Sequence, residues 1–429
     1  MKQMEEEQLF NKKVSVIGMG YVGLPLAIEV GRKFNTVGFD VSKKRICQLI
    51  NGNDLTGEVS NDDLNFSDVL FSSDHEKIRD SDIYIVAVPT PIDNVNRPDL
   101  NYLKDASELV GSVLSKDNIV IYESTVYPGA TEEVCVPILE RYSGLLFNKD
   151  FSCGYSPERI NPGDTSRRIT DIVKVTSGSN PHAAKFIDRF YSSFITAGTF
   201  KAKSIKVAEA AKVIENTQRD LNIALINEFS KIFNLLDINT HDVLSAARTK
   251  WNFIDFVPGL VGGHCIGVDP YYLAEKAQSV GYEPEIILAG RRMNDSMPSY
   301  VASKMITKLA KHRAKLCNLS ILILGVTFKE NCPDIRNSKA IHLMEELEKC
   351  GASVDCYDEL VSDEDFYRST NKKLIDFIPK AKYDGIIIAV GHDFVKKYTE
   401  NQLRSFGKDH LQIFDLKNCL PHIASDFVL

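Results

Sequence analysis

The chain has 429 residues, too many for one compact core, so two or three domains are expected. Its composition, 44% hydrophobic and 25% charged, is typical of globular proteins, and its formal net charge of −7 disfavours a general role on nucleic acid. No apolar run approaches the ~20 residues of a membrane span, and residues 1–13 lack the apolar stretch of a signal peptide, so a cytoplasmic protein without membrane insertion is expected.

The N-terminal part alternates between apolar strands and helical segments. Residues 13–18 are predicted to form a buried strand that enters a glycine turn, and residues 24–34 a helix. A second strand, residues 36–40, ends in an acid, and further strands are predicted at 82–88 and 119–122. This alternation predicts an α/β fold with a parallel, doubly wound sheet.

The pattern changes at Ser204. From there to Leu236 the chain shows helical periodicity without glycine or proline, which predicts one long helix, and helical material continues to about Leu309. A strand pattern returns at residues 319–325.

The C-terminal third repeats the pattern of the first. Residues 321–325 match 14–18, Tyr357-Asp358 matches Phe39-Asp40, and 386–390 match 83–88. The second copy lacks the glycine motif and carries a longer insertion, 326–338. We therefore predict two Rossmann-like doubly wound domains, 1–203 and 311–429, joined by a long central helix and a helical region, 204–310, with only the first copy built for a dinucleotide.

The turn after the first strand carries a dinucleotide motif. Gly18, Gly20 and Gly23 form GxGxxG between a strand and a helix, and Asp40 follows Gly18 by twenty-two residues. The helix N-terminus would bind the phosphates, and Asp40 would accept from the adenosine ribose and repel a 2′-phosphate. This favours NAD over NADP, although the basic run 43–45 leaves NADP open.

One face of the long helix is polar. Glu209, Lys212, Asn216 and Arg219 fall at i, i+3, i+7 and i+10. Such a stripe is often only solvated, but apolar neighbours surround Lys212 and Asn216, and this pair would suit a developing oxyanion.

Nine cysteines are scattered along the chain without a CxxC pair, which predicts neither a disulfide framework nor a metal site, and most are expected to be buried apolar residues. Cys265 differs, because its loop, 256–265, holds three glycines and a proline, and Asp269 follows four residues later. A thiolate there would be a nucleophile, helped by Lys212 and backbone amides. His264 is an alternative base, although adjacent side chains usually point apart. A dinucleotide site plus a thiol suggests an alcohol oxidised past the aldehyde, through a thioester, to an acid.

Several spaced motifs between Lys13 and Leu420 together resemble the nucleotide-sugar 6-dehydrogenases, the UDP-glucose and GDP-mannose dehydrogenase superfamily. They are the glycine turn 18–27, Val-Pro-Thr-Pro at 88–91, Glu-Ser-Thr-Val at 123–126, Ser-Pro-Glu-Arg at 156–159, the Lys212/Asn216 helix, the Cys265 loop, and Phe328-Lys329 with Asp334-Ile335-Arg336. The loop sequence 264–272 and the run 157–163 resemble the UDP-N-acetylhexosamine branch, within it the enzymes that make UDP-N-acetylglucosaminuronate or its galacto epimer for surface polysaccharides.

The resemblance implies oxidation of carbon 6 to a carboxylate with two NAD. Lys212, Asp269 and a water handle the first proton, and Cys265 then forms a thiohemiacetal and a thioester. Glu158 is the implied base for hydrolysis, with Lys212, Asn216 and Thr125 steadying the oxyanion. The residues implied to bind the cofactor, besides the glycines and Asp40, are Tyr21, Val22, Arg45, Thr90, Thr125 and Arg336. Those implied to bind the substrate are Glu158, Arg159, Lys212, Asn216, Arg248, Gly262, Lys329 and Lys417.

The resemblance also implies a homodimer that pairs through the long helix, with Arg248 reaching the partner's substrate. Lys417 stands near a position where the family has an arginine. Two other readings stay open: a two-electron dehydrogenase related to 6-phosphogluconate or 3-hydroxyacyl enzymes, and a catalytically silent nucleotide-sugar binder. UDP-N-acetylmannosamine and UDP-glucose are alternative substrates.

The dinucleotide motif generates a prediction about cofactor choice. Because the Asp40 carboxylate would repel a 2′-phosphate, kcat/KM should be higher with NAD than with NADP. Steady-state kinetics with both cofactors measure this, and equal values would show that Asp40 does not read the ribose.

Overall fold

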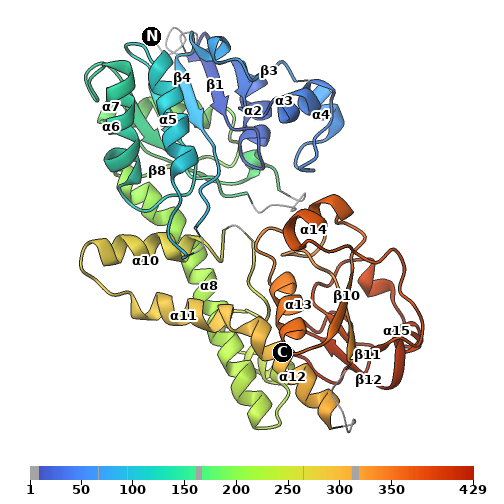
Figure 1. The fold of residues 1–429 in the computed structure, drawn as a ribbon. Coiled ribbons are helices and arrows are strands. Elements are labelled where there is room, and N and C mark those ends of the chain that lie inside the picture. Colours follow the sequence, from blue (N-terminus) through green and yellow to red (C-terminus); the bar gives the residue numbers. More distant parts are fainter. Residues whose placement is uncertain (1–8, 66, 94, 161–166, 264, 312–317) are drawn as a thin grey trace. The chain divides into compact units, whose positions relative to one another are not determined.

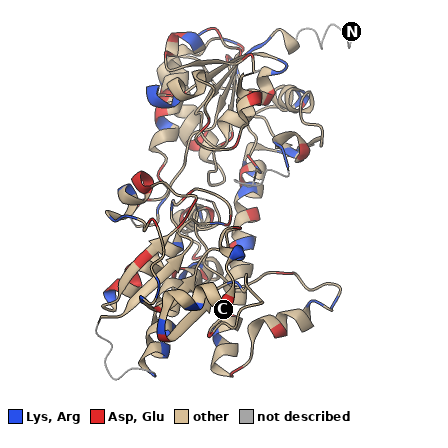
Figure 2. Cartoon of the chain, turned by 90° about the vertical axis from the view of Figure 1, so that its right-hand side faces the viewer, with Lys and Arg blue, Asp and Glu red and all other residues tan. Residues whose placement is uncertain are grey.

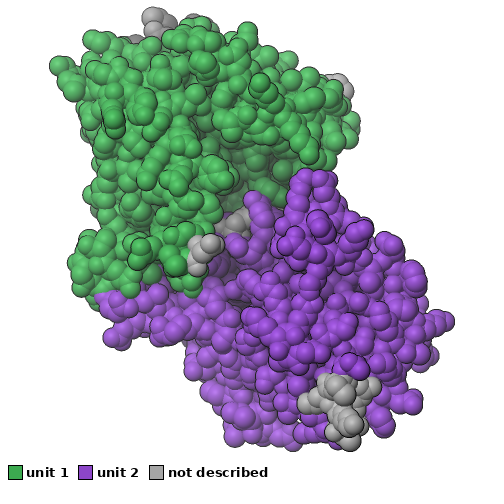
Figure 3. All heavy atoms as spheres, viewed as in Figure 1, with its two compact units in different colours: residues 1–215, 271–282 green, residues 216–270, 283–429 purple. Residues whose placement is uncertain are grey.

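The computed structural model describes residues 9–65, 67–93, 95–160, 167–263, 265–311 and 318–429. The chain divides into two compact units, residues 1–215 with 271–282 and residues 216–270 with 283–429 (Figure 3). The predicted three-domain division, 1–203, 204–310 and 311–429, remains a prediction.

The first unit is built on a six-stranded parallel sheet with the order β3-β2-β1-β4-β5-β6 (Figure 1). This is the strand order of a Rossmann dinucleotide-binding domain, as predicted. The strands are β1 (Lys13–Ile17), β2 (Asn35–Phe39), β3 (Leu70–Ser72), β4 (Ile83–Val86), β5 (Ile119–Tyr122) and β6 (Ser152–Tyr155). A parallel pair, β7 (Lys174–Thr176) and β8 (Thr199–Lys201), lies outside this sheet.

Helices accompany the strands of this unit because the connection between two parallel strands must cross over the sheet. They are α2 (Gly23–Gly31), α3 (Lys43–Ile50), α4 (Asn61–Asn65), α5 (Asn101–Val113), α6 (Val136–Ser143) and α7 (Pro181–Ser192), with the short turns η1 (His75–Ile78), η2 (Thr131–Cys135) and η3 (Ile169–Asp171). Every residue of β4 and β5 is buried, which explains their unbroken apolar runs.

A helix of 31 residues, α8 (Ile205–Leu235), confirms the long helix predicted for residues 204–236. Four more follow: α9 (Thr240–Ala247), α10 (Asp269–Ser279), α11 (Glu285–Asp295) and α12 (Met297–Ala310). More of the buried positions of α8 are polar than apolar. The buried polar residues are Glu209, Lys212, Thr217, Asp220, Asn227 and Ser230.

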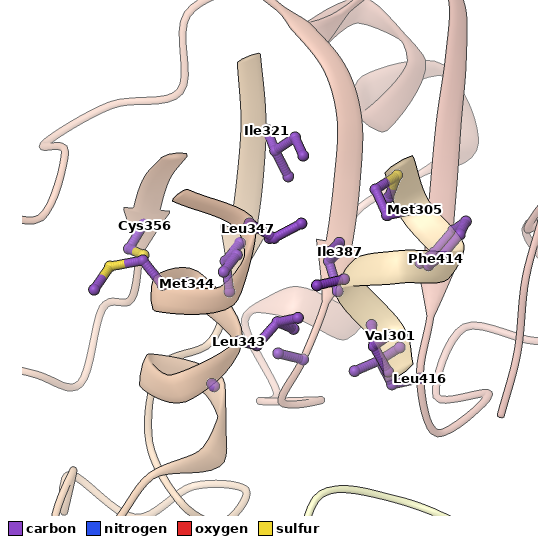
Figure 4. Close-up of a cluster of buried hydrophobic side chains, with 14 of the residues drawn as sticks. Val301, Met305, Ile321, Leu343, Met344, Leu347, Cys356, Ile387, Phe414 and Leu416 are labelled. Atoms are coloured by element: carbon purple, nitrogen blue, oxygen red, sulfur yellow. The ribbon is translucent and has the colours of Figure 1, made fainter. Parts of the chain in front are cut away.

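The second unit contains a four-stranded parallel sheet with the order β10-β9-β11-β12. Its elements are β9 (Ser320–Leu324), α13 (Lys339–Lys349), β10 (Ser353–Tyr357), α14 (Asp363–Thr370), β11 (Tyr383–Ile388), η4 (Val395–Lys397), α15 (Glu400–Phe406) and β12 (Gly407–Asp415). Alternate residues of β9 enter different cores. Ile321 and Ile323 pack in one cluster with α12 and α13 (Figure 4), and Leu322 and Leu324 pack in another.

Matching backbone contacts confirm the predicted internal repeat. The N–H of Gly18 donates to Phe39 O (2.8 Å), and the N–H of Gly325 donates to Tyr357 O (3.0 Å). Both glycines have a left-handed φ, +97° and +82°. In each copy, the residue after the glycine donates its N–H to the acid that follows the second strand, Asp40 or Asp358, at 2.8 Å.

Charge is distributed over both units. Figure 2 shows acidic and basic residues interspersed along the ribbons. Within the described part of the chain, no helix has the length and apolar character needed to cross a membrane.

Candidate active site

The glycine turn of the first unit fits a dinucleotide. A Cβ on Gly18 would lie 2.7 Å from Ala87 O, and one on Gly23 would lie 1.7 Å from Gly18 O, so these two glycines serve the turn itself. A Cβ on Gly20 would meet no atom within 4 Å. Packing does not demand a glycine there, which fits a backbone kept bare for a ligand.

The start of α2 adds to this fit. Val22 occupies its N-cap position and supplies no side-chain hydrogen bond, and the first turn holds no acidic residue. The amides and the dipole at this end therefore face no competing anion from the helix itself, which suits a pyrophosphate.

Asp40 is rigidly held at the end of β2. Its Oδ2 accepts the N–H of Met19 and its Oδ1 accepts the N–H of Ser42, each at 2.8 Å. Arg45 donates from Nε to Met19 O (2.8 Å), so it lies beside the residue that anchors Asp40.

A loop carboxylate that no sequence motif marks holds Arg45 in place. Asp54 accepts from Arg45 Nη2 at 2.7 Å, and its side chain is fully buried. Burial alone would raise the pKa of Asp54, but hydrogen bonds from Thr56 and Arg45 bring it below its ordinary value. The ionised carboxylate thus keeps Arg45 at the turn.

The corresponding acid of the second copy is closed off. Asp358 is buried, and His392 Nε2 lies 3.2 Å from its Oδ2. Because His392 Nδ1 accepts the N–H of Asn331 (2.9 Å), the ring proton must reside on Nε2, which faces Asp358 and Thr327. This imidazole caps the carboxylate, whereas Asp40 stays partly accessible. The difference explains physically why only the first copy can use this acid to bind the adenosine ribose.

Three further predicted residues follow the carboxyl ends of neighbouring strands of the first sheet. Thr90 follows β4, Thr125 follows β5 and Glu158 follows β6. Ser124 donates from Oγ to Val88 O (2.7 Å) and ties two of these loops together. Ligands of open parallel sheets bind at this edge.

Glu158 belongs to a buried charge cluster. Lys174 Nζ lies 2.7 Å from Glu123 Oε2 and 3.1 Å from Glu158 Oε2, and all three side chains are buried. Tyr191 donates its hydroxyl to the other oxygen of Glu123. Glu158 Oε1 accepts the N–H groups of Arg159 and Ile160, both at 2.6 Å.

The electrostatics of this cluster follow from burial and pairing. Burial raises the pKa of Glu123, although Lys174 opposes the shift. For Lys174, burial disfavours the charged form, yet the two carboxylates raise its pKa above the ordinary value. The lysine therefore stays charged and fixes Glu158. Lys174 was missed at the sequence level, and the available signal was a lysine inside the apolar run 172–175.

The polar stripe of α8 separates into different roles. Glu209 accepts the N–H groups of Gly129 and Thr131, so it anchors the helix to a loop. Lys212 is buried, whereas Arg219 is exposed. Arg159 pairs with Glu215 of α8 at 2.7 Å. The solvated-stripe interpretation thus holds only at Arg219.

The second unit brings three of the predicted residues together. Asn216 donates from Nδ2 to Asp269 Oδ2, and Asp269 is buried at the start of α10. The N–H of Asp269 donates to Cys265 O at 2.8 Å, and Cys265 is partly exposed. His264 lies outside the described residues, as does the segment 161–166.

The glycines before Cys265 are demanded by packing against the insertion 326–338. A Cβ on Gly262 would lie 2.6 Å from Asn337 O, and one on Gly263 would lie 2.7 Å from the Phe328 ring. The predicted substrate contact of Gly262 remains a prediction, and its visible role is to let two loops meet.

The remaining predicted residues have local partners. Lys417 pairs with Glu330 at 2.7 Å, Arg336 with Asp334 at 2.6 Å, and Arg248 with Asp255 at 2.7 Å. Lys329 O accepts from Thr327 Oγ1 at 2.8 Å, which shapes its turn. Among the described residues, no group of three or more His, Cys, Asp or Glu is arranged to hold a metal ion.

Comparison with known proteins decides the family. The NAD binding domain of the UDP-glucose/GDP-mannose dehydrogenase family matches residues 12–195, its central domain 206–296 and its UDP binding domain 322–422. UDP-N-acetyl-D-glucosamine 6-dehydrogenase of Salmonella typhi is 55% identical over 96% of this chain and 98% of its own length. The chain belongs to the UDP-glucose/GDP-mannose dehydrogenase family.

Two other members extend this comparison. UDP-N-acetyl-D-glucosamine 6-dehydrogenase of Pseudomonas aeruginosa is 54% identical over 97% of this chain and 99% of its own length. The solved structure of UDP-D-ManNAc dehydrogenase from Pyrococcus horikoshii superposes with a TM-score of 0.87 at 29% identity, covering 97% of this chain and 98% of that one. The family assignment makes this chain an NAD-dependent dehydrogenase.

The buried cluster of the dehydrogenase generates a stability prediction. Lys174→Met leaves Glu123 and Glu158 without a counter-charge and should cost about 3–5 kcal/mol near pH 8. Burial already raises the pKa of Glu123 above its unfolded value, and loss of Lys174 would raise it further. A carboxyl group with a raised pKa favours the folded state at low pH and disfavours it at higher pH. The loss of stability caused by Lys174→Met should therefore shrink towards about pH 5.

Urea unfolding of both proteins at the two pH values measures this. The double variant Glu123→Gln with Lys174→Met removes one buried carboxylate, and its deficit near pH 8 should be smaller. An equal deficit of the single variant at both pH values would contradict the charge explanation.

Proposed function

We propose that this dehydrogenase oxidises carbon 6 of UDP-N-acetyl-D-glucosamine to the carboxylate, giving the UDP-N-acetylhexosaminuronic acid. The observation that carries the proposal is 54–55% identity, over nearly the whole chain, to two proteins named for this activity. Relatives named UDP-N-acetyl-D-mannosamine dehydrogenase reach 28–32%. The product would serve surface polysaccharide synthesis, and the cytoplasm is the proposed compartment.

The first oxidation requires removal of the alcohol proton. NAD would supply the hydride acceptor, with one molecule used for each of the two oxidations. We assign the proton to a water held by Lys212 and Asp269. Asn216 supports this role, because it stands one turn after Lys212 on α8 and donates to Asp269.

The second oxidation needs Cys265. Its thiolate adds to the aldehyde carbon and forms a thiohemiacetal, whose carbon loses the second hydride and becomes a thioester. The partial exposure of Cys265 and its place in a glycine-rich loop support this role. Asn216, Lys212 and Thr125 would stabilise the oxyanion.

Hydrolysis of the thioester releases the acid and regenerates the thiol. Glu158 is the proposed base or water-orienting group, and its fixation by Lys174 supports a defined orientation. Arg159 would contact the substrate from the same loop.

The second copy supplies the proposed diphosphate contacts. Lys329 lies in the turn after β9, which Thr327 shapes, and we assign it to the substrate diphosphate. Arg336 is assigned to the cofactor, and Lys417 to the substrate. Support comes from the match of residues 322–422 to the family's UDP binding domain.

A homodimer is proposed from an apolar stripe on α8. Val207, Ile214, Leu225 and Ile232 are 47%, 55%, 47% and 44% exposed. Their intervals of seven, eleven and seven residues place them on one helix face, and Asn216 lies roughly 180° around. Exposed apolar stripes favour contact with another helix. In such a dimer, Arg248 is assigned to the partner's substrate.

Reaction stoichiometry tests the proposed function. A panel of UDP-glucose and the gluco, galacto and manno N-acetyl sugars should give the highest kcat/KM with UDP-N-acetylglucosamine and about two NADH per sugar, because a thioester pathway oxidises carbon 6 twice. NADH absorbance and mass analysis of the product measure this. One NADH per sugar would support the two-electron reading, and binding without NADH would support the silent binder.

The thiol has its own test. Cys265→Ser should abolish net acid formation or stop the reaction at a tightly held aldehyde, because the hydroxyl is a weaker nucleophile. Single-turnover mass analysis identifies the retained species. Cys350→Ser, at an exposed cysteine outside the site, is the control. Full acid production by Cys265→Ser would overturn the thioester mechanism.

The stripe on α8 predicts the oligomeric state. Leu225→Glu with Ile232→Glu should convert the dimer to a monomer and lower activity, because charges would be buried in an apolar contact. Light scattering measures the mass. Phe377→Glu, which changes an apolar side chain that is 74% exposed elsewhere, should remain dimeric. An unchanged mass for the α8 variant would exclude this interface.

A further inference from the structure

Buried polar side chains of α8 and α11 form a hydrogen-bonded network that anchors the loop before Cys265. Asn227 Oδ1 accepts the N–H of Gly259 (2.8 Å), and its Nδ2 donates to Gly259 O (3.0 Å). The same Nδ2 donates to Asn294 Oδ1 (2.8 Å), and Asn294 Nδ2 donates to Asp220 Oδ1 (2.7 Å). Asn227 therefore pairs with the loop backbone as a neighbouring strand would.

The direction of every bond in this chain is determined. The N–H of Gly259 can only donate and its carbonyl can only accept, which fixes the orientation of the Asn227 amide. The second N–H of that amide then requires an oxygen, which fixes Asn294 in turn. Asp220 accepts at the end, and Arg291 Nη1 donates to it at 2.6 Å. This network of side chains therefore has a single hydrogen-bonding arrangement.

If these four side chains served only to pack α8 against α11, burying their polar groups would cost unnecessary free energy. Asp220, Asn227 and Asn294 have no exposed surface, and Arg291 is 2% exposed. Burial raises the pKa of Asp220, against the charge of Arg291 and the bond from Asn294. Apolar residues of similar volume commonly stabilise a helix pair as well or better. The network thus fixes the position of the loop backbone in addition to holding α8 and α11 together.

The hydrogen-bonded network contacts the loop on both sides of Cys265. Gly259 precedes the thiol by six residues and is pinned by Asn227. Two residues after the thiol, a Cβ on Gly267 would lie 3.7 Å from Arg291 Nη2, so the same network borders the loop there. Asp269 has an independent anchor in Asn216 and lies in α10. Loss of the network would therefore disturb the thiol more than Asp269.

We propose that Asn227, with Asp220, Arg291 and Asn294 behind it, is the positioning residue for the Cys265 thiol, and that it holds the thiol where it captures the aldehyde before that intermediate escapes. This inference rests on the proposed function, in which Cys265 is the nucleophile of the second oxidation. The first oxidation relies on Lys212 and Asp269, so it should depend little on Asn227.

The test separates the two oxidations in Asn227→Leu, which keeps the side-chain volume and removes all three hydrogen bonds. Acid formation from UDP-N-acetylglucosamine should fall on the order of 100-fold, as for a displaced reacting group. The first hydride transfer, measured as single-turnover NADH formation, should change less than about threefold, because its proton-handling groups keep their anchors. Hydroxylamine should trap free aldehyde, and NADH per sugar should fall from about two towards one.

Controls separate positioning from loss of stability. Met305→Ala removes a fully buried side chain from the core of the second sheet and should lower the urea midpoint of unfolding while the stoichiometry stays intact. If Asn227→Leu does not fold, Asn227→Ser, which fits the same space, carries the test. Equal slowing of both oxidations, or about two NADH per sugar without trapped aldehyde, would overturn the positioning role. Wild-type acid formation by a parallel Cys265→Ser sample would instead overturn the thioester mechanism on which this inference rests, and absence of acid from the wild-type protein would overturn the proposed function.

Discussion

A single uninterrupted helix, α8, carries Lys212 and Asn216, the two residues that we assign to the oxyanion. Of the 31 residues of α8, those up to Glu215 belong to the first compact unit and those from Asn216 to the second. Glu209 fastens the helix to a loop of the first unit, and Asn227 fastens it to the Cys265 loop of the second. Lys212 and Asn216 lie between these anchors. Their separation of one turn is therefore a property of the helix and does not depend on loop conformation.

Both units contain buried polar clusters whose desolvation costs free energy. Lys174 neutralises part of the charge of Glu123 and Glu158 in the first unit, and Arg291 does so for Asp220 in the second. A buried ion pair contributes little net stability, since desolvation offsets its attraction. What such clusters provide is one preferred orientation. In the first unit the cluster fixes the orientation of the Glu158 side chain, and in the second it fixes the backbone at Gly259.

The two Rossmann-like copies show how one backbone plan accepts different ligands. Each copy uses a glycine turn and an acid after its second strand, with the same backbone hydrogen bonds. In the first copy the acid stays partly accessible, and Gly20 leaves the backbone bare. In the second copy His392 caps Asp358, and the longer insertion packs on Gly262 and Gly263. The fold is repeated while the site chemistry is not.

Local periodicity and motifs of fixed spacing were enough to predict the parallel sheets, the long helix, the internal repeat, the dinucleotide turn and the family. Lys174, Asp220, Asn227 and His392 acquired their roles only in the tertiary structure. Each works through a partner remote in sequence, such as Lys174 with Glu123 or Asn227 with Gly259. A buried polar residue reveals its function only when its hydrogen-bond partner is known, and chain folding decides that partner.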